Sequence, residues 1–121
     1  MIEAISAVTL AVRDMSRSVP FYEELGFTLI YGGADSPFST LRVGRAVVNL
    51  VSAEGREIRW WGRFILRVTN ADEQYRLFKE RGLAPERPRD ASWGERYFHM
   101  EDPDGHELSF AELLPSASSE T

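Results

Sequence analysis

The sequence predicts an α+β fold in which two βαβββ modules pair to form a curved mixed sheet around a cavity. Three observations predict it. Two stretches with alternating apolar and polar residues, "AVTLAV" at 7–12 and "RFILRV" at 63–68, have the pattern of half-buried strands. Each is followed by a capping residue and a segment of helical period, and each of these segments ends at a glycine. A repeated supersecondary unit indicates that neither copy buries its sheet alone.

The strands divide between the two modules, within one domain over residues 1–114. The first module, about 3–54, opens with a strand whose Val8, Leu10 and Val12 share the expected core face. Its later strands are expected in "FTLIYGG" (27–33), "STLRVG" (39–44) and "AVVNLVS" (46–52). The second module, about 61–113, continues with a weak strand signal in "LAPERP" (83–88) and clearer ones in "RYFHME" (96–101) and "HELSFAELL" (106–114). Loops are expected around 53–60 and 85–93, and a disordered tail over 115–121.

Both helices carry start and stop signals. Asp14 and Asn70 stand at the N-cap positions, where a side-chain oxygen can accept from a free backbone N–H. The glycines of "ELGF" (24–27) and "ERGL" (80–83) can take the left-handed conformation that ends a helix. Because proline is tolerated only in the first turn, Pro20 predicts that regular helix begins near Ser18. The expected apolar stripes are Met15, Val19, Tyr22 and Leu25, then Ala71, Tyr75, Leu77 and Phe78.

Composition and charge exclude several classes of function. With 14 Lys and Arg against 19 Asp and Glu, the net charge of −5 argues against binding a phosphate backbone, so nucleic acid is not an expected partner. The absence of cysteine excludes disulfides, thiolate catalysis and cysteine zinc sites. No basic leader precedes an apolar core, and no apolar run is long enough to cross a bilayer. We expect a soluble cytoplasmic protein without a membrane partner.

The "DPDG" stretch at 102–105 predicts a type I turn with a bulge, which sets the register of the last hairpin. In that register His99 faces Ser109 on a polar face that is expected to line the cavity. His106 is expected at the hairpin base, near solvent and without chemistry, whereas His99 is either a structural group or a functional one. The apolar face holds Phe98, Met100, Leu108 and Phe110; the polar face holds Tyr97, His99, Glu101, Glu107, Ser109 and Ala111.

The repeat and three stretches of sequence together resemble the vicinal oxygen chelate superfamily over residues 3–113. The stretches are "VTLAVRDMSRSVPFYEELGF", "WGRFILRV" and "WGERYFHMEDPDGHELSFAE". This superfamily includes glyoxalase I, bleomycin-resistance proteins, fosfomycin-resistance enzymes and extradiol dioxygenases. The resemblance implies paired βαβββ modules forming a curved sheet around a cavity, commonly in a homodimer.

The resemblance also implies where a metal would bind. In metal-dependent members, four cavity-facing side chains, usually His or Glu, hold a divalent ion; the matching positions here are Ala7, Asn49, Arg63 and Ser109. Alanine has no donor, arginine repels the ion, and Ser and Asn are weak neutral ligands. We therefore expect no family-type metal and no cofactor. A displaced site built from His99, Glu101 and Glu107 is the alternative.

A metal-free cavity would place other side chains around a ligand. Arg63 and Arg67 share a face, and a buried guanidinium needs water, a carboxylate such as Glu101 or Glu107, or an anionic ligand. The three tryptophans lie in loops leading into cavity strands and could stack on an aromatic ligand, or anchor the core or a dimer interface. The candidate ligand-binding residues are Arg63, Arg67, Asn49, Thr9, Trp60, Trp61, Trp93, Tyr97 and Ser109.

Three functions compete. The first hypothesis is a metal-free small-molecule binder of the bleomycin-resistance type, which sequesters a drug or metabolite. The second is a metal-independent isomerase, lyase or hydrolase acting on a small anionic substrate. There Arg63 would stabilise negative charge and His99 or Glu107 would move a proton. The third is a regulatory or interaction domain whose cavity is filled by its own side chains.

Overall fold

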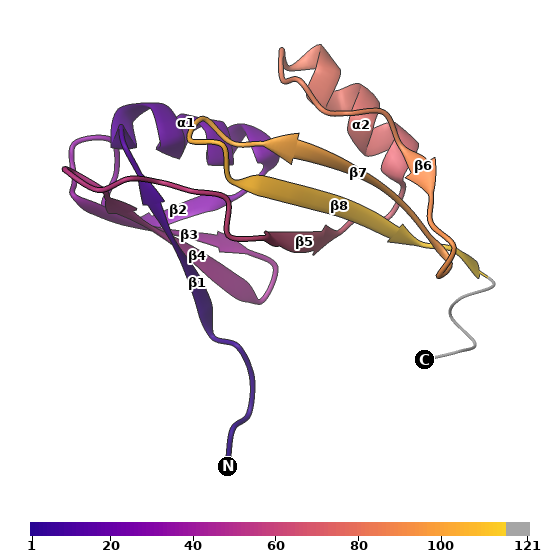
Figure 1. Ribbon diagram of the computed structural model, residues 1–121, viewed down its shortest axis with the longest axis horizontal. Helices are drawn as coiled ribbons and strands as arrows, with labels where there is room; N and C mark the ends of the chain where they lie inside the picture. Colours follow the sequence, from indigo (N-terminus) through magenta and orange to yellow (C-terminus); the bar gives the residue numbers. More distant parts are fainter. Residues whose placement is uncertain (116–121) are drawn as a thin grey trace. The chain divides into compact units, whose positions relative to one another are not determined.

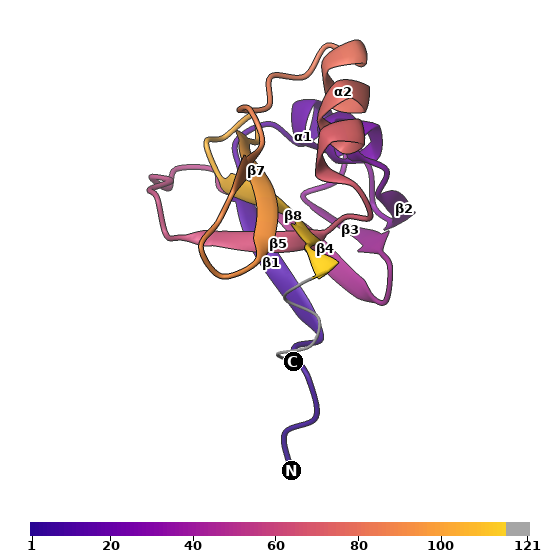
Figure 2. The ribbon, with the colours of Figure 1, turned by 90° about the vertical axis from the view of Figure 1, so that its right-hand side faces the viewer.

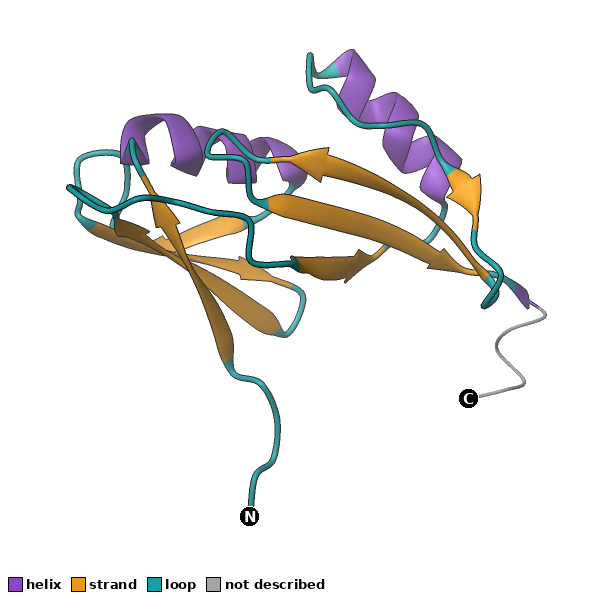
Figure 3. Cartoon of the chain, in the orientation of Figure 1, coloured by secondary structure: helices purple, strands orange, loops and turns teal. Residues whose placement is uncertain are grey.

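The chain divides into two compact units, Met1–Arg59 and Trp60–Thr121. The computed structural model describes residues 1–115, so the predicted disordered tail lies, apart from Pro115, outside the described residues. Each unit contains one helix and one four-stranded mixed sheet (Figure 3), which confirms the α+β class and the repeated βαβββ order.

The first unit is built from β1 (Ala7–Val12), α1 (Met15–Leu25), β2 (Thr28–Tyr31), β3 (Phe38–Val43) and β4 (Ala46–Ser52). The strand order is β1-β4-β3-β2, with β1 parallel to β4 and the other neighbours antiparallel. Alternation places one face of the sheet in the core, as predicted for β1. The buried core side chains of this sheet are Leu10, Val12, Leu41, Val48 and Leu50.

Helix α1 begins earlier than the sequence predicts. Asp14 is its N-cap, accepting from the Ser16 backbone N–H at 3.1 Å, and Gly26 ends it with a φ of 109°. The predicted start near Ser18 is therefore wrong, and Pro20 lies inside the helix. The missing proline N–H removes one hydrogen bond, but the first turn is already closed by bonds from Arg17 and Ser18 to the Asp14 carbonyl. The burial of Met15, Val19 and Tyr22 holds the segment against the sheet.

The second unit repeats this order with β5 (Arg63–Arg67), α2 (Ala71–Glu80), β6 (Arg89–Asp90), β7 (Glu95–Glu101) and β8 (Glu107–Leu113). Its sheet has the order β5-β8-β7-β6, and α2 lies over one face of it (Figures 1 and 2). The weak strand signal at 83–88 was misplaced, because the edge strand is only the two residues of β6. Pro85 and Pro88 carry no N–H to give to a ladder, so the paired strand begins after them at Arg89, although the Glu86 N–H between them donates to the His99 carbonyl of β7.

The core of the second unit lies between α2 and the apolar face of its sheet. Phe78 packs against Phe98 and Phe110 with ring centroids 6.1 and 5.0 Å apart. Leu77, predicted in the same stripe, is 38% exposed, because one residue rotates the side chain by about 100° around the helix. The predicted hairpin register is confirmed: Phe98 pairs with Phe110, His99 with Ser109 and Met100 with Leu108. Over residues 60–115, the other face of this sheet carries no helix of its own unit.

Among the described residues, neither helix has the length and apolar character needed to span a membrane.

Candidate functional site

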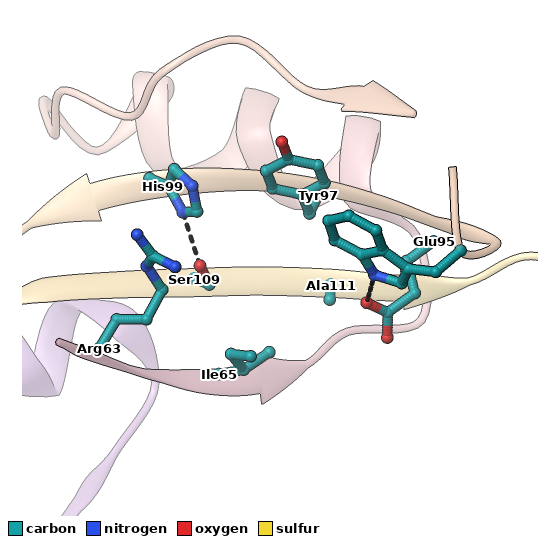
Figure 4. Close-up of a pocket in the computed structure, with 8 residues that line it drawn as sticks. Arg63, Ile65, Glu95, Tyr97, His99, Ser109 and Ala111 are labelled. Atoms are coloured by element: carbon teal, nitrogen blue, oxygen red, sulfur yellow. Dashed lines mark hydrogen bonds between the residues drawn. The ribbon is translucent and has the colours of Figure 1, made fainter. Parts of the chain in front are cut away.

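The open face of the second sheet carries a hollow of about 110 Å³ (Figure 4). Strand alternation on β5, β7 and β8 brings its side chains to one face, opposite the phenylalanine core. Four predicted binding residues, Arg63, Trp93, Tyr97 and Ser109, meet there together with His99. The full lining is Arg63, Ile65, Trp93, Glu95, Tyr97, His99, Ser109 and Ala111.

Arg63 is held by a carboxylate. Its Nε donates to Oε2 of Glu107, the residue directly opposite it in the β5–β8 pairing. The side chains are 40% and 22% exposed, so the pair is partly desolvated. Of the three partners that the sequence allowed for Arg63, the structure shows this internal ion pair.

His99 and Ser109 form a hydrogen-bonded pair across β7 and β8. The Ser109 Oγ lies 2.5 Å from the His99 Nδ1, and Ser109 is almost fully buried. Burial lowers the pKa of His99, with a further lowering from Arg63 that Glu107 opposes. The imidazole is therefore neutral near pH 7 and can exchange hydrogen bonds with a ligand without adding charge.

Two stacked rings form one wall of the hollow. The Trp93 and Tyr97 rings have centroids 6.1 Å apart and an interplanar angle of 23°, and Trp93 Nε1 donates to Glu95 Oε1 at 2.8 Å. The Arg89 guanidinium carbon lies 5.3 Å from the Tyr97 ring centroid. Trp93 is 66% exposed, which leaves its ring surface accessible to a ligand.

The sequence reasoning missed Ile65 and Glu95 as lining residues, whereas Ala111 was expected on the cavity face of the last hairpin. Alternation contained the signal: Ile65 lies between Arg63 and Arg67 on the same face, and Glu95 lies two residues before Tyr97. The predicted binding residues Arg67, Trp60 and Trp61 do not line the hollow.

Trp61 bonds His106 instead of lining the hollow, and this contact shows that the expectation of a solvent-exposed His106 was wrong. The Trp61 Nε1 donates to the His106 Nδ1 at 2.9 Å, and His106 is only 5% exposed rather than near solvent. Because an indole N–H can only donate, Nδ1 is the acceptor in this bond. His106 thereby ties the segment before β5 to the "DPDG" turn. In that turn, the Asp102 carboxylate accepts from the His106 backbone N–H at 2.9 Å.

The remaining predicted residues, Thr9 and Asn49, lie on the open face of the first sheet. They form a polar ladder with Thr40: the Thr40 hydroxyl donates to Asn49 Oδ1 at 2.7 Å, and Asn49 Nδ2 donates to Thr9 Oγ1 at 3.3 Å. The three side chains come from β3, β4 and β1 and satisfy one another.

The side chains at the four positions that the resemblance matches to metal ligands do not fit a metal ion. Ala7 has no donor, the Asn49 amide is used in the ladder, Ser109 bonds His99, and Arg63 is a cation paired with Glu107. Over residues 1–115, no group of three or more His, Asp or Glu side chains is arranged to hold an ion, including the displaced set of His99, Glu101 and Glu107.

Comparisons with known proteins agree with this architecture. The model of the Glyoxalase/Bleomycin resistance protein/Dioxygenase superfamily matches residues 4–110. The bleomycin resistance determinant encoded on transposon Tn5 is 24% identical, with a TM-score of 0.77 and coverage of 92% of this chain and 98% of that one. A fosfomycin resistance protein from Listeria monocytogenes is 17% identical, with a TM-score of 0.78 and coverage of 97% and 98%.

The lactoylglutathione lyase from Agrobacterium tumefaciens is 16% identical, with a TM-score of 0.79 and coverage of 92% of this chain and 94% of that chain. At these identities the likeness concerns the fold. No protein with a curated description matches the sequence significantly.

Proposed function

The chain belongs to the Glyoxalase/Bleomycin resistance protein/Dioxygenase superfamily, and from this membership we propose that it is a metal-free small-molecule-binding protein of the glyoxalase/bleomycin-resistance type. Its ligand binds in the hollow of the second unit. One observation carries the proposal: a stacked pair, exposed Trp93 on half-buried Tyr97, stands beside a hydrogen-bonded polar pair, half-buried His99 and buried Ser109, in the same hollow. Such a site combines an apolar surface with a few fixed polar groups, as ligand sites do.

The size and charge of the hollow define the ligand. A volume of about 110 Å³ is below the roughly 300 Å³ of the smallest typical drug sites, so the hollow takes one planar group of a ligand. Glu107 already balances Arg63, and Glu95 adds a further carboxylate to the lining. A neutral or cationic aromatic or heteroaromatic group therefore fits better than an anion.

Ligand titrations test this proposal. A panel of antibiotics, planar aromatic cations, neutral heteroaromatics and aromatic carboxylates is added while the melting temperature and tryptophan fluorescence are followed. A binding ligand raises the melting temperature once its concentration exceeds Kd. We expect Trp93→Ala to abolish this effect. Trp60→Ala is the matched control, because Trp60 is equally exposed at 67% but does not line the hollow.

Two results would contradict the proposal. One is a panel in which no compound shifts the melting temperature. The other is an equal loss of binding in the Trp93 and Trp60 variants, which would locate the ligand outside the hollow.

A second function is favoured by the lowered pKa of His99 beside the Ser109 hydroxyl and Arg63. A neutral imidazole can accept a proton from a substrate, and the guanidinium can stabilise the oxyanion that develops, if the substrate oxygen competes with Glu107. We therefore propose, as the alternative, a metal-independent isomerase, lyase or hydrolase. Under this alternative, His99→Ala and Arg63→Ala lower kcat by about 100-fold or more while part of the binding remains. A protein that only sequesters its ligand has no turnover to lose.

A further inference from the structure

A second concave site lies on the other side of the same sheet. A groove of about 470 Å³ is lined by Asp72, Tyr75, Arg76, Arg87, Pro88 and Arg96. Arg96 alternates with Glu95 and Tyr97 along β7, so its side chain leaves the sheet on the helix side, away from the hollow. The groove shares no lining residue with the hollow.

Arg96 is fixed in this groove by two carboxylates. Its Nε donates to Asp72 Oδ1 and its Nη1 to Asp90 Oδ1, each at 3.0 Å. The second terminal nitrogen, Nη2, takes part in neither of these bonds. The guanidinium is thus oriented before any ligand arrives, which reduces the entropy lost on binding.

Arg76 and Arg87 have no such partners. Within residues 1–115, no hydrogen bond or ion pair joins either guanidinium to another side chain. The backbone at Arg87 is nevertheless restrained. Pro85 and Pro88 fix φ on either side, and the Glu86 N–H donates to the His99 carbonyl at 2.9 Å.

Three arginines therefore line the groove, and the two aspartates near them, Asp72 in the lining and Asp90 beside it, both pair with Arg96, in a protein whose net charge is −5. The Lys79 Nζ, 5.7 Å from the centroid of the Tyr75 ring, adds a further cation nearby. Guanidinium groups match the oxygens of a phosphate in pairs, and the rings of Tyr75 and Pro88 offer apolar contact to a carbon skeleton. We propose that this groove binds a phosphate monoester, with Arg76 and Arg87 as its principal ligands.

Calorimetric titration of the full chain with phenyl phosphate at constant ionic strength tests the proposal. We expect one saturable site, with inorganic phosphate binding more weakly because it lacks the ring. Arg76→Gln and Arg87→Gln should each lower the association constant about tenfold, as the loss of one charged hydrogen bond predicts. The matched control is Arg45→Gln, an exposed arginine of the β3–β4 turn with the same change in charge, which should leave binding within about twofold.

Equal affinities in the Arg76, Arg87 and Arg45 variants would overturn the proposal, since they would show that phenyl phosphate responds only to the overall charge of the protein and not to the groove. Benzoate binding as tightly as phenyl phosphate would overturn the assignment to phosphate monoesters. The substituted arginines in the groove are exposed, so the variants should keep the melting temperature of the parent protein. Trp93→Ala should leave phenyl phosphate binding unchanged, which separates this result from the fate of the proposed function.

Discussion

The lowered pKa of His99 couples protonation of one side chain to the stability of the fold. Burial lowers this pKa; Glu107 and Glu86 favour the charged form, whereas Arg63 and Arg89 oppose it. The ordinary pKa of a histidine side chain is about 6.5, and the pKa of His99 in the folded protein lies below it. The stability contributed by neutral His99 is therefore complete above about pH 6.5 and is lost as the pH falls through the folded pKa.

The direction of the pKa shift predicts how the stability of the fold changes with pH. The urea midpoint of unfolding should fall between about pH 7.5 and 5.5, and it should fall less in His99→Gln, which cannot titrate. The midpoints are read from fluorescence-detected unfolding at both pH values. A His99→Gln variant that keeps the full decrease would show that other groups cause it.

The Trp61–His106 hydrogen bond gives a second expectation at the scale of single residues. Trp61→Phe keeps most of the ring but removes the donor to the buried Nδ1 of His106, so the free energy of unfolding should fall by about 1–2 kcal/mol. Trp60→Phe is the control, because Trp60 is 67% exposed and should change stability by less than about 0.5 kcal/mol. Chemical denaturation of both variants measures the difference, and equal effects would contradict a role for this bond.

Individual residues show what the sequence could and could not predict. Alternation placed Arg63, His99 and Ser109 on the open face, and charge reasoning named Glu107 as one possible partner of Arg63. The burial of His106 was missed because its partner, Trp61, lies in a loop. Loop residues carry no periodicity from which a direction can be read.

Among the connecting elements, the β2–β3 loop depends on a close backbone approach at Gly32. A Cβ at this residue would lie 2.2 Å from the Phe38 carbonyl oxygen, and its φ of 79° is already strained for other residues. Gly32→Ala should therefore lower the free energy of unfolding by about 2–4 kcal/mol. Gly44→Ala, with a φ of 57° but nothing within 4 Å, should cost only about 1–2 kcal/mol. Thermal and urea unfolding would compare the two, and a larger loss at Gly44 would contradict the argument.

Strand boundaries were predicted best where clear alternation of apolar and polar residues coincided with an absence of proline. The predicted β1 and β4 ranges, 7–12 and 46–52, coincide with the strands. The predictions were wrong where proline was involved, because its effect depends on context. Pro20 is accommodated in a helix held by its buried side chains, while Pro85 and Pro88 delay the edge strand until Arg89.

For the whole molecule, the side chains at the four positions matched to metal ligands predict that divalent metal ions do not change the stability of the fold. Removing divalent ions with a chelator should leave the melting temperature within error, and adding Zn²⁺, Mn²⁺ or Ni²⁺ at low concentration should not raise it. Metal analysis of protein purified without chelators provides the independent measurement. A stoichiometric ion, or a chelator-sensitive melting temperature, would contradict a metal-free protein.

The family resemblance also leads us to expect a homodimer. Several large apolar side chains are exposed within the described chain, including Ile65 at 63% and Trp60 at 67%, and association would cover part of this surface. Sedimentation equilibrium should give twice the mass of the chain at micromolar concentrations. A single-chain mass at every concentration would contradict the expectation.

The shared strand register has a consequence for protein engineering. Asn49 pairs with Thr9 and Thr40 in the first sheet as Ser109 pairs with Ile65 and His99 in the second, and Ala7 pairs with Val47 as Arg63 pairs with Glu107. Point substitutions at the equivalent strand positions could therefore transfer these polar side chains from the second module to the first. A graft of Ala7→Arg, Val47→Glu, Thr40→His and Asn49→Ser would copy the ion pair and the His–Ser pair into the first sheet without the aromatic wall, so that the contribution of the polar groups could be measured apart from that of the stacked rings.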